Sequence, residues 1–161
     1  MTGGTVKVTT PSPREVRLTR VFDAPKRLVW DCYTKPELIR RWGGGPPGWE
    51  LTVCDNDLKV GGAWRRVMKG PNGEEMGFGG VFKEIVPGER IVTTEKFDQS
   101  WYEGDAESML ELVESDGKTT LTITVKYASQ EVRDAVLKSP MAMGMEMGFN
   151  ALAQLLATLH A

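Results

Sequence analysis

The chain has 161 residues, of which 40% are hydrophobic, and a formal net charge of -2. A chain of this size can bury the core of one ordinary domain. Positive and negative residues are interleaved along it, which argues against binding to nucleic acids or anionic membranes. No apolar run approaches the roughly 20 residues that span a bilayer, and the first residues do not resemble a signal peptide. We therefore expect a cytoplasmic protein that neither binds nucleic acid nor inserts into a membrane.

The first regular segments are predicted to be strands. Residues 5–9 alternate valine with polar residues, which is typical of a short strand or an ordered tail, before two prolines break the pattern. The segment Arg14–Phe22 alternates apolar and charged residues, which predicts a strand with one buried face. We expect residues 1–13 to form a tail or short extra strand, and residues 14–161 to form a single domain.

A pair of short helices is predicted after this strand. Asp23 followed by Pro25 is typical of a helix start, because an aspartate side chain accepts hydrogen bonds from first-turn amides and proline suits the first turn. The segment Thr34–Glu37 should end this helix and cap a second one that carries Trp42.

The stretch Trp42–Trp49 separates the helix pair from the strands that follow. Two tryptophans enclose glycines and prolines, which do not support regular structure. Because loops on a rigid scaffold often carry binding residues, we expect Trp42 and Trp49 to lie at the rim of a pocket, with Trp101 of a later loop.

From Trp49 onward the apolar period changes to two, and turn signals separate successive antiparallel strands. The predicted strands are residues 49–54, 62–69, 75–86, 89–97, 107–114 and 119–127. Gly77, Gly79 and Gly80 weaken strand propensity within one of them, so they predict a bulge or a close approach of another element. The last strand alternates apolar residues with threonines, which predicts that one face of the sheet contacts water.

Two helices are predicted to complete the chain. A short one begins at Ser129 and stops before Pro140. A long one, from about Met141 to Leu159, carries an apolar stripe. Only the sheet offers enough apolar surface to receive this stripe, so the pattern predicts an α+β fold with a long helix across an antiparallel sheet.

The long helix also contains two glycines and several methionines. Gly144 and Gly148 favour either close contact between helix and sheet, our preferred interpretation, or space beside a ligand. Four methionines alternate from Met141 to Met147 and cannot share one face. We expect at least two of them to line the core and the others to be free to contact an apolar ligand.

We predict no catalytic residue, no metal and no cofactor. The one histidine, His160, lies next to the end of the chain, and Cys32 and Cys54 are too far apart to complete a zinc site. Both cysteines are expected to be reduced, partly buried thiols. Four carboxylates adjoin the proposed pocket, and we expect them to be solvated rather than catalytic: Glu50, Asp55, Asp57 and Glu84.

Several motifs occur in a fixed order: Thr19–Pro25, Pro36–Leu38, Arg41–Gly43, Asp57–Gly62, Gly80–Ile85, Pro87–Ile91 and Gly117–Leu121. Together they resemble the activator of heat-shock-protein-90 ATPase homologue-like family, within the wider group of START domains and polyketide cyclases. The resemblance implies a helix-grip fold, in which a curved antiparallel sheet of about seven strands wraps a long C-terminal helix and leaves a cavity. Family members often carry a shorter Trp-Gly-Pro motif at Trp42–Pro46, so this lip should be longer and looser.

The resemblance and the supply of aromatic residues favour a non-enzymatic protein that binds a small, mainly hydrophobic molecule between the last helix and the sheet. The residues expected to contact it are Trp42, Trp49, Trp64, Phe78, Phe82, Phe97, Trp101, Met145 and Phe149. One alternative is a co-chaperone-like regulator of a heat-shock-protein-90 ATPase, with a chaperone as partner and a role in stress response. The other is a cyclase- or hydrolase-type enzyme, which requires a buried carboxylate or polar pair facing the cavity.

Overall fold

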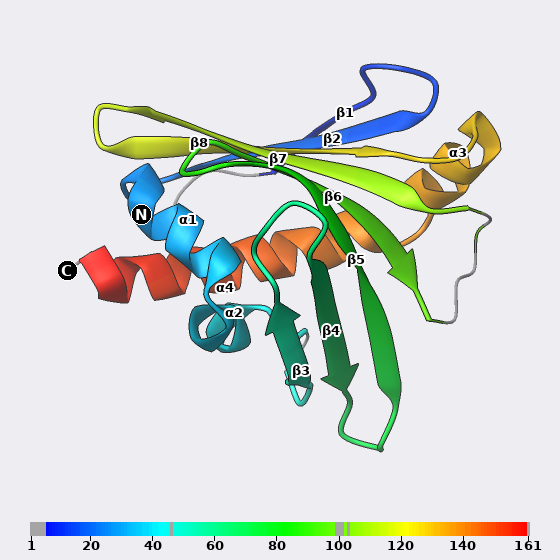
Figure 1. The fold of residues 1–161 in the computed structure, drawn as a ribbon, viewed down its shortest axis with the longest axis horizontal. Coiled ribbons are helices and arrows are strands. Elements are labelled where there is room, and N and C mark those ends of the chain that lie inside the picture. Colours follow the sequence, from blue (N-terminus) through cyan, green and yellow to red (C-terminus); the bar gives the residue numbers. More distant parts are fainter. Residues whose placement is uncertain (1–5, 46, 99–101, 103, 161) are drawn as a thin grey trace.

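A computed structural model describes residues 6–45, 47–98, 102 and 104–160 (Figure 1). Its strands are β1 (Lys7–Thr9), β2 (Glu15–Phe22), β3 (Glu50–Asn56), β4 (Ala63–Lys69), β5 (Glu75–Val86), β6 (Arg90–Phe97), β7 (Ala106–Ser115) and β8 (Lys118–Lys126). Its helices are α1 (Lys26–Thr34), α2 (Pro36–Trp42), α3 (Gln130–Lys138) and α4 (Met141–His160). The predicted α+β class and the positions of the main elements are confirmed.

The strands form one 8-stranded sheet in the order β1-β2-β8-β7-β6-β5-β4-β3. All neighbours are antiparallel. The sheet has one strand more than the family resemblance implied, because Lys7–Thr9 pairs with Arg17–Thr19 of β2. In Figure 1 the sheet curves around α4, the arrangement of a helix-grip fold.

The helix starts agree with the sequence prediction at α3 but not at α1. The Ser129 side chain accepts a hydrogen bond from the Val132 amide and caps α3, as predicted. At α1 the cap position is Pro25, which has no side-chain bond, so the prediction that Asp23 caps this helix is wrong. Asp23 lies too far before the first turn, and the Lys26 amide instead donates to Glu114 Oε1 of β7 at 2.7 Å.

The predicted apolar stripe of α4 packs against the sheet. Phe149 is 1% exposed and meets Phe22 of β2 in an edge-to-face contact with the ring centroids 6.0 Å apart. Leu152 and Leu156 of the same stripe are also buried. Large-to-small changes at such sites cost several kcal/mol because they remove buried surface and leave a cavity. The core therefore lies between α4 and the inner face of the sheet, which is the face turned toward this helix.

The inner face is covered only in part. One row of neighbours across β6, β7 and β8 is 7% exposed at each position: Ile91, Leu110 and Ile123. The next row on the same face is only half-buried: Thr93, Ser108 and Val125. The two rows lie on the same face, because side chains at i and i+2 share a face of a strand. The inner face is therefore less covered at the second row than at the first.

Candidate functional site

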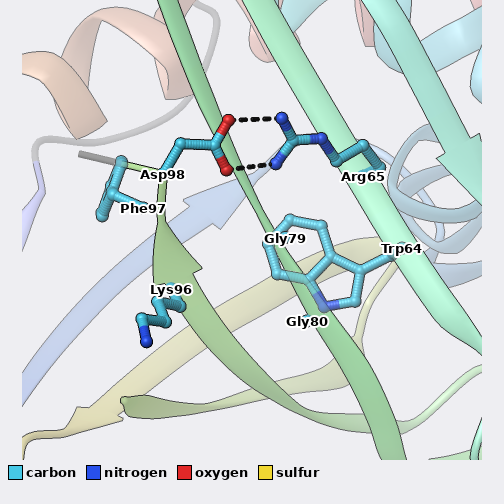
Figure 2. A pocket seen from close by; sticks show the side chains of 7 residues that line it. All are labelled: Trp64, Arg65, Gly79, Gly80, Lys96, Phe97 and Asp98. Carbon is cyan, nitrogen blue, oxygen red and sulfur yellow. Dashed lines mark hydrogen bonds and ion pairs between the residues drawn. The ribbon is translucent and has the colours of Figure 1, made fainter. Parts of the chain in front are cut away.

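A surface depression lies over β4, β5 and β6. It has a volume of about 340 Å³, at the small end of ligand-site sizes. Figure 2 shows the residues that line it: Trp64, Arg65, Gly79, Gly80, Lys96, Phe97 and Asp98. The Arg65 guanidinium binds both carboxylate oxygens of Asp98, with one contact of 2.6 Å, so this two-pronged ion pair joins β4 to the end of β6. It passes over Gly77, where any side chain would collide with both partners.

The hydrogen-bond ladder between β5 and β6 is interrupted beside this depression. Pairing runs to Gly79 opposite Lys96 and resumes at Phe82 opposite Thr93. In the interval the Trp64 indole Nε1 donates to the Thr94 carbonyl at 3.1 Å, and the Val81 amide donates to Thr94 Oγ1 at 3.0 Å. An indole and a hydroxyl thus replace part of the regular backbone pairing.

The predicted close approach at the three glycines of β5 is confirmed. A Cβ at Gly80 would overlap the Thr94 carbonyl oxygen, and one at Gly79 would lie 2.5 Å from the Trp64 carbonyl oxygen. A side chain at Gly80 would therefore disturb the acceptor of the Trp64 indole. These glycines permit the tight strand approach that holds Trp64 in place.

Five aromatic rings form a continuous series, called here the aromatic array: Trp64, Phe78, Phe97, Tyr102 and Tyr127. Successive ring centroids are 5.8, 5.2, 6.4 and 5.7 Å apart. Three of the four contacts are edge-to-face, a geometry that aromatic pairs prefer, and the fourth is tilted. The array runs from β4 through β5 and β6 to Tyr102 and then to Tyr127, which follows β8, and its rings at Trp64 and Phe97 also line the depression.

Glu95 lies beside the array. It lies in phase with Thr93 and Phe97 along β6, and it pairs with the buried Ala106 of β7. Its side chain is therefore on the inner face of the sheet. Burial raises the pKa of its carboxyl group above the ordinary value. Burial raises the pKa of Tyr102 to about 12, and the negative charge of Glu95 contributes to this shift. Burial also raises the pKa of Tyr127, with smaller contributions from Tyr102 and Glu95. Both phenols therefore lie within electrostatic reach of Glu95.

The structure brings together some of the sequence-predicted site residues. Trp64, Phe78 and Phe97 join in the array. Phe82 is buried on the same face of β5, where the ladder resumes. Phe149 lies in the core under the sheet and Met145 is half-buried against it, both on α4. Trp101 lies outside the described residues.

Trp42 and Trp49 lie apart from the array. Trp42 donates a hydrogen bond from Nε1 to the Cys32 carbonyl at 2.7 Å, and its ring packs against the Tyr33 ring at a tilted angle, with the centroids 4.9 Å apart. Trp49 is half-buried and packs over Gly70, where a Cβ would lie 2.9 Å from its indole ring. Their assignment to a rim remains a prediction.

The preferred interpretation of the α4 glycines is wrong. A Cβ at Gly144 would meet no atom within 4 Å, and one at Gly148 would meet only the edge of Trp42, at 3.9 Å. Neither glycine is therefore required by tight contact between helix and sheet. The sequence predicts that at least two of the four nearby methionines line the core. Met145 packs against the core, whereas Met143 and Met147 are solvent-exposed, at 64% and 40%.

The carboxylate that the structure singles out was missed by sequence reasoning. The four considered there, Glu50, Asp55, Asp57 and Glu84, are all exposed. Glu95 could have been found from the alternation along β6, which places it in phase with Ile91 and Phe97 on the apolar face. Tyr127 could be found in the same way, because it is in phase with the apolar residues of the predicted strand 119–127. Tyr102 lies in the connection after β6 and carries no such periodic signal.

Within the described ranges, no group of three or more His, Cys, Asp or Glu side chains is arranged to hold a metal ion. Cys32 and Cys54 are free thiols that are 0% and 3% exposed. Burial raises the pKa of both. Among the helices of the described residues, none combines the length and apolar composition needed to cross a membrane.

Comparison with known proteins gives a consistent family signal. A family model described as "Activator of Hsp90 ATPase homolog 1-like protein" matches residues 23–157. A crystal structure from Rhodobacter sphaeroides is similar with 31% identity and a TM-score of 0.91, covering 96% of this chain and 99% of that one. One from Chromobacterium violaceum has 30% identity and a TM-score of 0.75, covering 89% and 97%.

A third similar structure, from Mycobacterium smegmatis, has 26% identity and a TM-score of 0.84, with coverage of 98% and 99%. None of the curated proteins compared with the chain matches it. The similarity to solved structures spans nearly the full length of both partners in each comparison, so it includes the elements that carry the depression and the array.

Proposed function

We propose a ligand-binding function for this chain, which belongs to the Activator of Hsp90 ATPase homolog 1-like family. The proposed ligand is a small, mainly hydrophobic molecule. The ligand is held between α4 and the inner face of the sheet, against the aromatic array. The helix-grip fold of this family supports ligand binding in general terms.

The observation that carries the proposal is the aromatic array on an incompletely covered face. Phe78, Phe97 and Tyr102 are each only half-buried, although they belong to the apolar side of the sheet. When an apolar ligand covers rings that are partly in water, the free energy of the complex is lowered by about 25 cal/mol for each Å² of apolar surface buried. A binding surface made of rings with few polar groups is typical of small-molecule sites.

A ligand panel tests this proposal. We expect native mass spectrometry with fatty acids, flavonoids and aromatic polyketides to detect at least one complex, and amide resonances of β4, β5 and β6 to shift on binding. Phe97→Ala should weaken binding about tenfold because it removes a central ring. Val113→Ala, at a 65% exposed strand position, is the matched control and should leave binding unchanged. If no ligand shifts these resonances, the proposal is wrong.

Glu95 favours a second candidate function, proton transfer in a cyclase-type enzyme. A buried carboxyl with a raised pKa is suited to act as a general acid or base. This function predicts that Glu95→Gln abolishes turnover of a bound polyketide while the complex still forms, as seen by mass spectrometry of substrate and product. Equal turnover by both proteins would eliminate the role of Glu95.

The family description suggests a third candidate, stimulation of a heat-shock-protein-90 ATPase. Mixing the protein with the chaperone and measuring ATP hydrolysis tests it directly. An unchanged hydrolysis rate at saturating protein would count against this function.

A further inference from the structure

We infer that the ligand of this protein is an amine, whose ammonium group binds Glu95 among Phe97, Tyr102 and Tyr127 while its apolar body lies along the rest of the aromatic array. This inference rests on the proposed ligand-binding function and specifies the chemical class of the ligand. It follows from the charge, the rings and the partial exposure found at one place on the inner face.

The carboxylate of Glu95 lacks a compensating charge within the protein. Among the described residues, none forms an ion pair or a hydrogen bond with it, and burial is the only cause of its raised pKa. The neighbouring cations are engaged elsewhere, since Arg65 binds Asp98 and Lys96 approaches Asp105 at 4.0 Å. A charge that has lost part of its solvent and has no partner is costly, so a ligand cation at this position would be stabilised by the half-buried Glu95.

The cations on the inner face are also held away from Glu95. The Arg66 guanidinium lies 5.4 Å from the centre of the Trp64 ring, at the far end of the array, and donates to Asn56 Oδ1 and the Asp55 carbonyl. Arg20 of β2 donates to Asn150 of α4 at 2.7 Å. Neither contributes to the electrostatic causes of the Glu95 pKa.

The rings around Glu95 suit an ammonium group. Phe97, Tyr102 and Tyr127 are linked by edge-to-face contacts at 6.4 and 5.7 Å, so their faces point in different directions. Ring faces attract cations through the quadrupole, by about 0.5–2 kcal/mol for each well-placed ring. The phenols are protonated at neutral pH, and burial raises the pKa of each further above its ordinary value of 10.0, so they add no competing negative charge.

The remaining array provides the apolar half of the site. Phe78 lies 5.2 Å from Phe97, and Trp64 follows at 5.8 Å from Phe78. A ligand with its ammonium group at Glu95 would place an aromatic or alkyl body over these rings. Glu95 is half-buried, as are Thr93 and Ser108 in the adjacent row, whereas its strand partner Ala106 is 1% exposed. Part of the Glu95 side chain therefore remains in contact with solvent.

Three compounds with the same body test the inference: 3-phenylpropylamine, 3-phenylpropanol and 3-phenylpropanoate. Isothermal titration and amide shifts at neutral pH should show the amine binding about tenfold more tightly than the alcohol, and the carboxylate most weakly. Glu95→Gln should remove the preference for the amine and leave alcohol binding within about threefold. Glu50→Gln, at an exposed position of β3, should keep the wild-type order.

A second variant keeps the inference testable if the Glu95→Gln protein does not fold. Tyr102→Leu keeps the carboxylate and removes one ring, so it should reduce amine affinity several-fold more than alcohol affinity. Equal affinity for the amine and the alcohol in the wild-type protein, or an amine preference that survives Glu95→Gln, would overturn the inference. If none of the three compounds binds while other members of the ligand panel do, the inference fails and the proposed function stands. If nothing in either set binds, the proposed function fails.

Discussion

Glu95 occupies a strand position at which an apolar side chain would be expected. Its neighbours in phase along β6 are Ile91, which is 7% exposed, and the half-buried Phe97. A carboxylate between such residues weakens the folded state whenever it is ionised, because burial removes water from the charge. Residues that lower stability in this way are concentrated at functional sites, which is why this position carries the ligand proposal.

The first prediction concerns the pH dependence of stability. Burial raises the pKa of Glu95 in the folded protein above its ordinary value of 4.5, so the folded state holds the proton more tightly than the unfolded chain. The contribution of Glu95 to the free energy of unfolding therefore falls as pH rises from about 4.5 through the folded pKa. Glu95→Gln should be more stable than wild type at pH 7.5, with a smaller difference at pH 4, as measured by urea unfolding.

The exposed Glu50 provides the control for this measurement. Glu50→Gln should follow the wild-type stability at both pH values. A Glu95→Gln variant that is no more stable than wild type at pH 7.5 would show that the buried carboxylate does not lower stability.

At the scale of the elements, β5 and α4 use glycine for opposite reasons. Gly80 allows β5 to approach the Thr94 carbonyl that accepts the Trp64 indole hydrogen bond. Gly144 lies in α4, where an added Cβ would meet no atom within 4 Å. The local sequence gives both residues the same low propensity for regular structure, and only the packing around them separates their roles.

A pair of substitutions should reveal this difference. Gly144→Ala should raise the free energy of unfolding by up to about 1 kcal/mol, because alanine favours the helix and has space. Gly80→Ala should lower it by about 1–3 kcal/mol, because the methyl group displaces the Thr94 carbonyl from its indole partner. Urea unfolding of both variants checks the prediction, and a Gly80→Ala protein as stable as wild type would contradict the tight strand approach.

The elements were largely predictable from the sequence, whereas their contacts were not. Strand positions such as Glu75–Val86 follow from the period of two and from turn residues, which are local features. The capping residue of α1 was wrongly predicted, because the first helix amide bonds to Glu114, which is 88 residues away in sequence. The array was predicted only at Trp64, Phe78 and Phe97, since Tyr102 lies in a connection outside the strands and Tyr127 follows β8, which is distant in sequence from β4, β5 and β6.

At the scale of the whole molecule, one hydrophobic cluster joins the sheet to its helices. It runs from Val16 of β2 to Leu156 of α4 and includes residues of α1 and α3. The first long strand, β2, pairs with the last strand, β8, so strands that are about 100 residues apart in sequence are neighbours in the sheet. We propose that residues 14–161 form a single domain, as predicted from the sequence, and the shared cluster supports this proposal.

This organisation predicts cooperative unfolding. Tryptophan fluorescence and far-ultraviolet circular dichroism should give coincident urea transitions, because the core that α4 shares with the sheet cannot be lost in parts. Val113→Ala, at an exposed site of β7, should leave both transitions in place. Separate transitions for the two probes would indicate that the chain folds as more than one unit.

The interruption between β5 and β6 also gives the protein a spectroscopic label. The Trp64 indole proton is held by the Thr94 carbonyl, and the Trp42 indole proton is held by the Cys32 carbonyl in the helix pair. Both protons should therefore exchange slowly with solvent deuterium, in two different parts of the molecule. Opening of the sheet would accelerate exchange at Trp64 alone, with Trp42 as an internal reference, so motion at the depression can be followed in the unmodified protein.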